Sequence, residues 1–362
     1  GIPEYRLPRE VLTEEIQRIV DAGVELRCGK RVGRDISFAE LDRNYAAIFI
    51  AVGAHRSYRL GIPGEDVTGV EGAVEWLRTY NTSGTAEVGK RVAVIGGGNS
   101  AVDAARTARR LGAETVTMFY RRVRKEMPAQ PAEIQAALDE GIEIVELVAP
   151  VQVLERDGRV SGLELQRMDL SGFDRAGRKQ PVPLEGATYT VEIDTLLSAI
   201  SQQADLEFLP DDGAVEAGPS KIKAGKRCTT SNAKVWAGGD AVSGPAMVID
   251  AIRAGQEAAR SIDGALRQAA GDEPWVAAPP RAIEIPFAVD EEAAERPLAA
   301  MPHADPAKRS GDFREVELGF DRATAVAEAG RCMRCDLNPD ELESLQAENE
   351  PSNVIMLNSA RD

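Results

Sequence analysis

The sequence lacks long apolar runs, a disulfide framework and any excess of positive charge, and each absence removes a class of protein. The longest apolar stretch, "AAIFIAVGA", falls short of the ~20 residues that span a bilayer, so we expect no membrane contact. Four cysteines in 362 residues do not make a disulfide framework, which favours a reducing, cytoplasmic compartment. A net charge of -16 argues against nucleic-acid partners, because phosphates are met by Lys and Arg.

The negative charge is concentrated in the last quarter of the chain. Residues 271–362 hold 20 acidic and 9 basic side chains, with Pro-rich stretches and no sustained periodicity. This pattern is typical either of a solvated tail or of an extended arm over a surface. Within it, "FREVELGFDRATAVAEAGRCMRC" shows a short strand-like and then a helix-like pattern.

The centre of the sequence carries a dinucleotide fingerprint. "KRVAVIGGGNSAVDAARTARRLGAETVTMFYRR" combines a buried strand, a glycine-rich turn, a helix and a second strand within about thirty residues. Gly96 permits the sharp turn, Gly98 lets a pyrophosphate approach the backbone, and Ala101 allows close helix packing. The helix start offers free N–H groups to phosphate, and Asn99 and Ser100 are placed to cap the helix or donate to phosphate oxygens.

The end of the second strand carries the residues that select the nucleotide. A free ribose hydroxyl is usually met there by Asp or Glu, whereas a 2'-phosphate calls for Arg. The sequence at residues 120–125 is "YRRVRK", so we favour NADP over NAD, with Arg121 and Arg122 as the contacts. Pairing of these arginines with nearby acids would leave the preference open.

A second nucleotide signature lies downstream in "NAKVWAGGDAVSGPAMVIDAIRAGQEAARSI". It predicts a short strand, a Gly239-Asp240 turn and an amphipathic helix. Asp240 can accept a hydrogen bond from a ribityl or ribose hydroxyl, and the helix start can meet a pyrimidine edge or a phosphate.

Together these signatures resemble the pyridine nucleotide-disulfide oxidoreductase-like proteins of the glutamate synthase small-subunit type. Related proteins are the flavin part of dihydropyrimidine dehydrogenase and the large subunit of NADH-dependent ferredoxin:NADP oxidoreductase. The matching stretches are "GIPEYRLP" (1–8), "AVGAHRSYRLGIPGED" (51–66), "GGGNSAVDAARTARRLGA" (96–113), "YRRVRKEMPA" (120–129), "LSAISQQAD" (197–205) and "VWAGGDAV" (235–242). The resemblance covers roughly residues 1–265.

The resemblance implies an α/β fold of two nested Rossmann-like dinucleotide-binding domains. Residues 88–200 would be the NAD(P)-binding insert, while 1–87 and 201–268 would be two parts of the FAD domain and 269–362 the acidic C-terminal arm. The family's N-terminal FAD fingerprint, which normally precedes "GIPEYRLP", is missing from these residues, and we expect an incomplete sequence. The flavin contacts implied by the resemblance are Ile2, Pro3, Arg6, Leu7, Gly53, Gly239, Asp240, Ala246, Met247 and Val248.

A Cys-x-x-C motif, Cys332 and Cys335, lies in the acidic arm. Two cysteines at this spacing suit half of an iron-sulfur or zinc site, but such sites normally need four ligands. Three alternatives stay open: a cluster site completed by a partner or by other residues, a redox pair, or two unliganded thiols.

The function that follows is a flavoprotein electron-transfer subunit, with the chemistry carried by flavin and nicotinamide and not by catalytic side chains. NAD(P)H would exchange hydride with FAD, and FAD would exchange electrons with iron-sulfur centres of a partner subunit in a hetero-oligomer. A glutamate synthase small subunit is one alternative. An alternative of another class is a flavin-free NAD(P)-binding or structural subunit.

Overall fold

The computed structural model describes residues 1–173, 177–210, 212–273, 292 and 295–332. The chain divides into two compact units, of which the first contains Gly1–Trp275 and Asp305–Glu315. The second contains Val276–Ala304 and Val316–Asp362. In the described residues no helix has both the length and the apolar character needed to cross a membrane.

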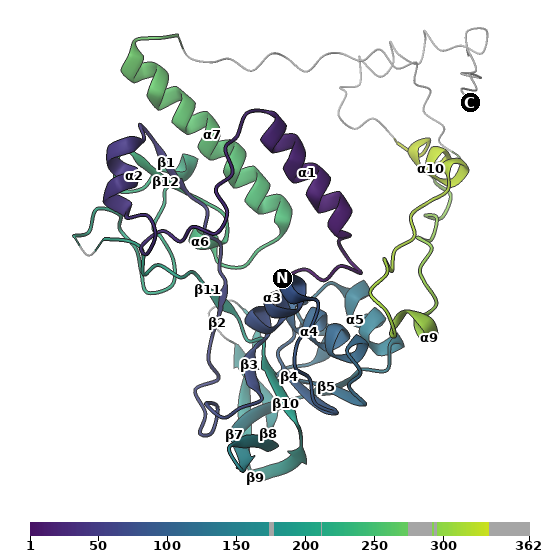
Figure 1. Cartoon of the computed structure of the whole chain (residues 1–362). Helices are drawn as coiled ribbons and strands as arrows, with labels where there is room; N and C mark the ends of the chain where they lie inside the picture. Colours follow the sequence, from purple (N-terminus) through teal and green to yellow (C-terminus); the bar gives the residue numbers. More distant parts are fainter. Residues whose placement is uncertain (174–176, 211, 274–291, 293–294, 333–362) are drawn as a thin grey trace. The chain divides into compact units, whose positions relative to one another are not determined.

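The sheet with the most strands in the described part of the first unit is a five-stranded parallel sheet (Figure 1). Its order is β3 (Val70–Gly72), β10 (Thr195–Ser198), β4 (Arg91–Ile95), β5 (Thr115–Tyr120) and β6 (Glu143–Glu146). The sequences of β4, β5 and β10 are rich in apolar residues because both faces of a parallel sheet are covered. The edge strand β3 lies ahead of residue 88, where the family resemblance implies the start of the NAD(P) insert.

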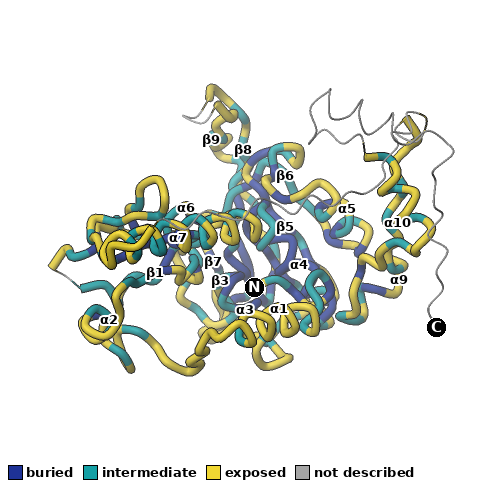
Figure 2. The backbone as a smooth tube through the Cα atoms, turned by 90° about the horizontal axis from the view of Figure 1, so that it is seen from above, coloured by how far each residue is buried: buried dark blue, intermediate teal, exposed yellow. Residues whose placement is uncertain are grey.

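Helices cover one face of this sheet and a second sheet covers the other. The helices are α3 (Ala73–Ser83), α4 (Asn99–Arg110) and α5 (Pro131–Asp139), and their core includes Trp76, Val102 and Met118. Figure 2 shows α4 mostly buried, since its many alanines allow close packing. The other face meets an antiparallel sheet of β7 (Val148–Arg156), β8 (Arg159–Phe173) and β9 (Lys179–Glu192), with Leu163 and Leu165 buried between them.

A separate, smaller core surrounds a two-stranded parallel sheet, β1 (Ile48–Ile50) with β12 (Val235–Ala237). The chain passes between the two cores along the antiparallel pair β2 (Arg56–Ser57) and β11 (Gln202–Gln203). The remaining elements before residue 273 are α1 (Arg9–Asp21), α2 (Phe38–Asn44), η1 (Arg124–Glu126), η2 (Lys226–Cys228), α6 (Asp240–Ser243) and α7 (Val248–Ala270).

Two short helices follow in the C-terminal part. α9 (Pro306–Arg309) belongs to the first unit, where the Arg309 side chain is buried. In the second unit, α10 (Arg322–Ala329) confirms the helical pattern predicted there, and Asp321 caps it by accepting a hydrogen bond from the Thr324 amide at 2.7 Å. The preceding strand-like pattern forms an isolated bridge between His303 and Glu317.

Candidate functional site

The turn between β4 and α4 requires glycine at its first two positions. Gly96 has a φ of 143°, and an added Cβ would lie 2.4 Å from the carbonyl oxygen of Ala199. A Cβ on Gly97 would lie 2.7 Å from a ring carbon of Tyr120. These glycines are therefore fixed by packing against the exit of β10 and the end of β5.

Gly98 differs from its two neighbours because open space lies in front of it. The closest contact of an added Cβ would be the Pro128 side chain at 3.9 Å. Gly98 directly precedes α4, and no described side chain caps that helix start. The uncapped amides and the positive end of the helix dipole therefore fit a pyrophosphate that approaches the Gly98 backbone.

The residues after Gly98 hold the surroundings of the turn in place. Asn99 Oδ1 accepts a hydrogen bond from the Gln130 amide at 3.1 Å, and Ser100 Oγ accepts one from Gln202 Nε2 at 2.8 Å. Ala101 is fully buried in the sheet-helix core. Asn99 and Ser100 thus bind the loop before α5 and the strand β11, instead of capping α4.

The two arginines after β5 lie in different environments. Arg121 is exposed, whereas Arg122 is only 4% exposed. Arg122 Nε donates to the carbonyl oxygen of Lys179, at the start of β9, at 3.0 Å. Arg124 and Lys125 are exposed like Arg121, so the cations at the surface beyond β5 are those three and not Arg122.

The residues predicted downstream of β12 come together at the start of α7. The amide of Ala246 donates to Asp240 Oδ1 at 3.2 Å, which folds the small-residue loop back onto the turn. Partial burial raises the pKa of Asp240. Met247 and Val248 are exposed at the helix start, where no described side chain provides a cap.

The first seven residues form a tight turn that contacts helices α4 and α5. Pro3 accepts backbone hydrogen bonds from Arg6 and Leu7, each at 3.1 Å. The Arg6 guanidinium contacts Asp103 of α4 and Glu133 of α5. Gly53, by contrast, lies in the segment between β1 and β2. Its φ is 68°, and a Cβ added to it would lie 2.9 Å from the His55 ring.

The Cys-x-x-C motif is only partly within the described residues. Cys332 is exposed, and Cys335 lies outside them. Within the described residues no group of three or more His, Cys, Asp or Glu side chains is arranged to hold a metal ion.

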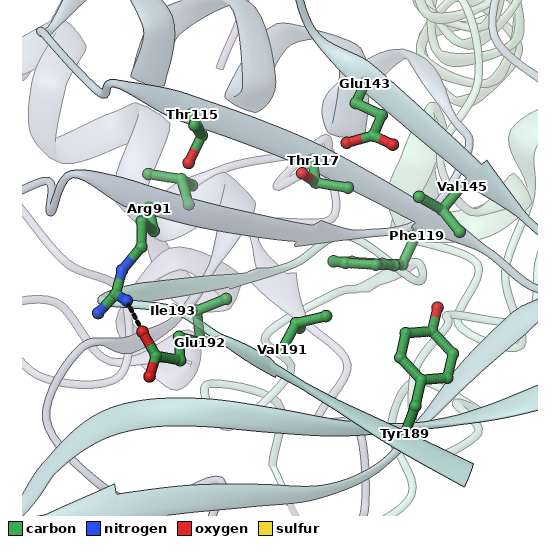
Figure 3. A pocket seen from close by; sticks show the side chains of 11 residues that line it. Arg91, Thr115, Thr117, Phe119, Glu143, Val145, Tyr189, Val191, Glu192 and Ile193 are labelled. Atoms are coloured by element: carbon green, nitrogen blue, oxygen red, sulfur yellow. Dashed lines mark hydrogen bonds and ion pairs between the residues drawn. The ribbon is translucent and has the colours of Figure 1, made fainter.

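A cavity of 240 Å³ lies between one face of the parallel sheet, at β4, β5 and β6, and the strand β9 (Figure 3). Its lining includes Arg91, Thr115 and Glu143 from the amino ends of the parallel strands. The Gly98 turn follows the carboxyl end of β4, so this cavity is separate from that turn.

The Gly98 turn and its strand-helix context agree with a match of residues 9–255 to the family model "Pyridine nucleotide-disulphide oxidoreductase". The chain belongs to the pyridine nucleotide-disulphide oxidoreductase family. The match extends over the five-stranded sheet, its helices and the start of α7, up to residue 255.

Three curated relatives of the chain are named as subunits or chains of oxidoreductases. The chain is 41% identical to NADP(+)-dependent formate dehydrogenase subunit beta of Moorella thermoacetica, covering 92% of this chain and 48% of the relative. It is 37% identical to NADPH-Fe(3+) oxidoreductase subunit beta of Geobacter sulfurreducens, covering 92% and 55%. It is 33% identical to the glutamate synthase [NADPH] small chain of Escherichia coli, covering 72% and 59%. The chain thus spans about half the length of the first two.

A solved structure gives the same fold for this member of the pyridine nucleotide-disulphide oxidoreductase family. FprA from Mycobacterium tuberculosis, in complex with NADPH, matches with a TM-score of 0.60 at 18% identity over 75% of each chain. At that identity the likeness supports the α/β dinucleotide-binding fold only.

Sequence reasoning missed a buried ionic cluster beside the α4 helix. Arg106 and Arg110 of α4 both contact Glu140, whose side chain is fully buried, and Arg309 reaches the same carboxylate from α9. Tyr5 is fully buried against them, with the Arg110 guanidinium 3.9 Å from its ring centre. The one signal in the sequence was the pair of arginines one helical turn apart on an otherwise alanine-rich face.

Proposed function

We propose that the chain belongs to an electron-transfer subunit in which hydride passes between NAD(P)H and FAD, and electrons pass between FAD and iron-sulfur centres of a partner. The observation that carries this is the open backbone at Gly98, before an uncapped α4, in a chain with a second strand-turn-helix unit at Asp240. The names of the formate dehydrogenase, NADPH-Fe(3+) oxidoreductase and glutamate synthase subunits support the same class.

The proposed NAD(P) site is built on the β4–α4 turn. Gly98 and the first amides of α4 would bind the pyrophosphate, while Gly96, Asn99, Ser100 and Ala101 keep the turn and its neighbours in shape. Arg121, exposed at the end of β5, would meet a 2'-phosphate, which favours NADP. Arg122 would hold the segment after β5 in place through its hydrogen bond to the Lys179 carbonyl oxygen.

The proposed FAD site uses three segments of the chain. Its residues are Ile2, Pro3, Arg6, Leu7, Gly53, Gly239, Asp240, Ala246, Met247 and Val248. Asp240, held by the Ala246 amide, would accept from a hydroxyl of the cofactor, and the α7 start would bind its polar edge. When both groups are bound, the rings supply transfer of a hydride, which is two electrons and one proton, from one to the other.

We propose that this FAD half is completed by a further strand-turn-helix unit outside these 362 residues. The sheet β1–β12 has two strands, and an isolated pair of strands is at best marginally stable in water. Apolar side chains are exposed on α1 and α7, including Ile19, Ile249 and Ile252. A missing N-terminal FAD fingerprint would cover surfaces of this kind.

The domain division that we propose follows the resemblance. It consists of the FAD parts 1–87 and 201–268, the nested NAD(P) insert 88–200, to which β3 adds its strand, and the acidic arm 269–362. Residues 305–315 of the arm would fasten it to the NAD(P) half through Arg309. We propose that the arm, with Cys332 and Cys335, contacts an iron-sulfur partner in a hetero-oligomer. We also propose a cytoplasmic location, because four cysteines in 362 residues suit a reducing compartment.

The absorbance spectrum of the purified full-length protein tests this proposal. Flavin bands are expected, and a protein without them would favour the flavin-free or structural alternative. Assay with a glutamate synthase large subunit separates the second alternative, because glutamine-dependent glutamate formation would identify a small subunit of that enzyme. We expect no such activity, since the relatives covering 92% of this chain are subunits of other oxidoreductases.

A further inference from the structure

We propose that Asp103 is a positioning residue, whose ion pair with Arg6 fastens the turn of residues 2–7 to helix α4 and so fixes the flavin relative to the nicotinamide. The inference rests on the proposed function, which assigns the turn to the flavin and the α4 start to the NAD(P)H pyrophosphate. Asp103 touches neither group in this arrangement. Its effect is on the alignment of the two rings.

The pair is close and charged, and its carboxylate is shielded from water. Arg6 Nη1 donates to Asp103 Oδ1 at 2.8 Å and to Oδ2 at 3.0 Å, and the Asp103 residue is 5% exposed. Arg6 Nε lies 3.1 Å from Glu133 Oε1 of α5. One guanidinium thus joins the turn to two helices of the NAD(P) half, through charge-assisted hydrogen bonds that are stronger than neutral ones.

The neighbouring Tyr5 holds the turn from its other side. Its ring is fully buried and stands 3.9 Å from the Arg110 guanidinium and 4.8 Å from that of Arg106. Those two arginines are fixed in turn by the buried Glu140 carboxylate. The turn is therefore attached at two successive side chains to the same helix.

Hydrogen bonds within and beside the turn also fix the position of its first residues. Arg6 and Leu7 both donate to the Pro3 carbonyl, so the backbone between them is closed on itself. The Ile2 carbonyl accepts from Arg9 Nη2 at 3.0 Å and from Asn81 Nδ2 at 3.4 Å. Asp103 lies one helical turn beyond Asn99, the first residue of α4, so a shift of the pair changes the distance from the turn to the nucleotide end of the helix.

This placement predicts an effect on rate and not on affinity. Hydride transfer needs the reacting atoms about 3–3.5 Å apart, and misplacement by about 1 Å can cost roughly 100-fold. Nucleotide affinity depends on the Gly98 backbone and α4 amides, which the pair does not contact. Loss of the pair should therefore slow flavin reduction while NADPH binds as before.

The pH profile provides a signature that a purely structural contact would not give. Burial raises the pKa of Asp103 to about 6, against the lowering effect of Arg6 and Arg106, while Glu133 across from it raises the pKa further. The pair is therefore complete above about pH 6 and loses its negative partner below. Flavin reduction in the wild type should rise through that pH, and this step should be absent from Asp103→Asn.

The test is anaerobic stopped-flow reduction of the full-length, flavin-loaded protein by NADPH, with hydrogen exchange as a second readout. Asp103→Asn should lower the limiting reduction rate roughly 10- to 100-fold. It should leave the NADPH dissociation constant within about threefold, a change worth well under 1.4 kcal/mol. Exchange of the Arg6 and Leu7 amides should become faster while that of β4 and β5 is unchanged.

The matched control is Asp194→Asn, which removes another Arg-Asp pair, with Arg91 Nη2 and Asp194 Oδ1 2.7 Å apart at the amino end of β4. It should leave the reduction rate unchanged. If Asp103→Asn does not fold, Asp103→Ser takes its place, and Asp103→Glu should restore part of the rate by keeping the negative charge.

An unchanged rate in Asp103→Asn, a fall equal to that of Asp194→Asn, or a dissociation constant that rises as much as the rate falls would each overturn the positioning role. Failure of the wild-type flavin to be reduced by NADPH would instead overturn the proposed function, and the inference with it. The two failures are therefore distinguished by the wild-type trace alone.

Discussion

Arg309 Nε lies 2.9 Å from Glu140 Oε1, although 169 positions separate the two residues. The contact brings the segment Asp305–Glu315 into the first unit, where Phe313 also stacks on Tyr80 with ring centres 4.5 Å apart. Glu140 is thus the common acceptor for three buried or nearly buried guanidinium groups. Its loss would remove the buried counter-ion that the three guanidinium groups share.

Substitution of that carboxylate should destabilise the fold strongly. We expect Glu140→Gln to lower the free energy of unfolding by about 3–5 kcal/mol, the usual cost of breaking a buried ion pair from one side. Urea denaturation followed by circular dichroism measures it. Glu114→Gln, which removes an exposed partner of Lys90, should cost no more than about 1 kcal/mol. Equal losses in the two variants would contradict the special role of Glu140.

Acid should unfold the wild type by titrating the same group. Burial alone would raise the pKa of Glu140, but hydrogen bonds from Arg110 and Arg106 outweigh it and hold the pKa at about 2, below the ordinary 4.5. A carboxyl group whose pKa is lowered by folding stabilises the fold at pH values above its unfolded pKa. For Glu140 this contribution is lost as the pH falls from 4.5 toward 2. The stability difference between wild type and Glu140→Gln should therefore shrink over that range, and a constant difference would refute the assignment.

Alanine substitutions in the glycine turn should separate binding from packing. An added methyl group at Gly98 meets open space, so Gly98→Ala should fold normally and weaken NADPH binding at least about tenfold, or ~1.4 kcal/mol. At Gly97 the methyl group would collide with Tyr120, so Gly97→Ala should cost about 1–3 kcal/mol of stability. Calorimetric titration measures NADPH binding, and thermal melting measures stability. Unaltered NADPH binding by Gly98→Ala would show that the pyrophosphate does not bind at this turn.

The two arginines after β5 should have opposite phenotypes. Arg121→Glu should shift the preference from NADPH toward NADH, since Arg121 is exposed where the 2'-phosphate is proposed. Arg122→Ala should lower stability and leave the preference largely intact, since Arg122 is buried and bonded to Lys179. Titration of NADPH and NADH against each variant measures the preference. A preference for NADPH that is lost in Arg122→Ala and kept in Arg121→Glu would show that Arg122, and not Arg121, binds the 2'-phosphate.

Local sequence patterns predicted the parts of this site that are formed by neighbouring residues. The β4 strand, its glycine turn and α4 were predictable because Gly96, Gly98 and Ala101 follow an apolar run at fixed spacing. The loop that folds Ala246 onto Asp240 was also local, since six positions separate them. In both cases backbone geometry and short-range chemistry determine the structure.

The remainder depends on contacts between distant positions, which spacing does not encode. The sequence shows two equivalent arginines after β5, and only the path of β9 decides that Arg122 is buried. Arg6 was expected beside the flavin, and its guanidinium is bound by Asp103, 97 positions away. The acidic arm showed no sign that Arg309 enters a buried cluster, because a single arginine in a Pro-rich stretch has no periodicity to mark it.

We propose above all that NADPH bound at the Gly98 turn delivers hydride to a flavin in the same protein. The most direct measurement is the visible absorbance of the full-length, flavin-loaded protein during anaerobic titration with NADPH, with Gly98→Ala in parallel. We predict that one equivalent of NADPH bleaches the flavin bands of the wild type, and that the variant requires a large excess. A wild-type flavin that stays oxidised, or a variant that is bleached as readily as the wild type, would contradict the account.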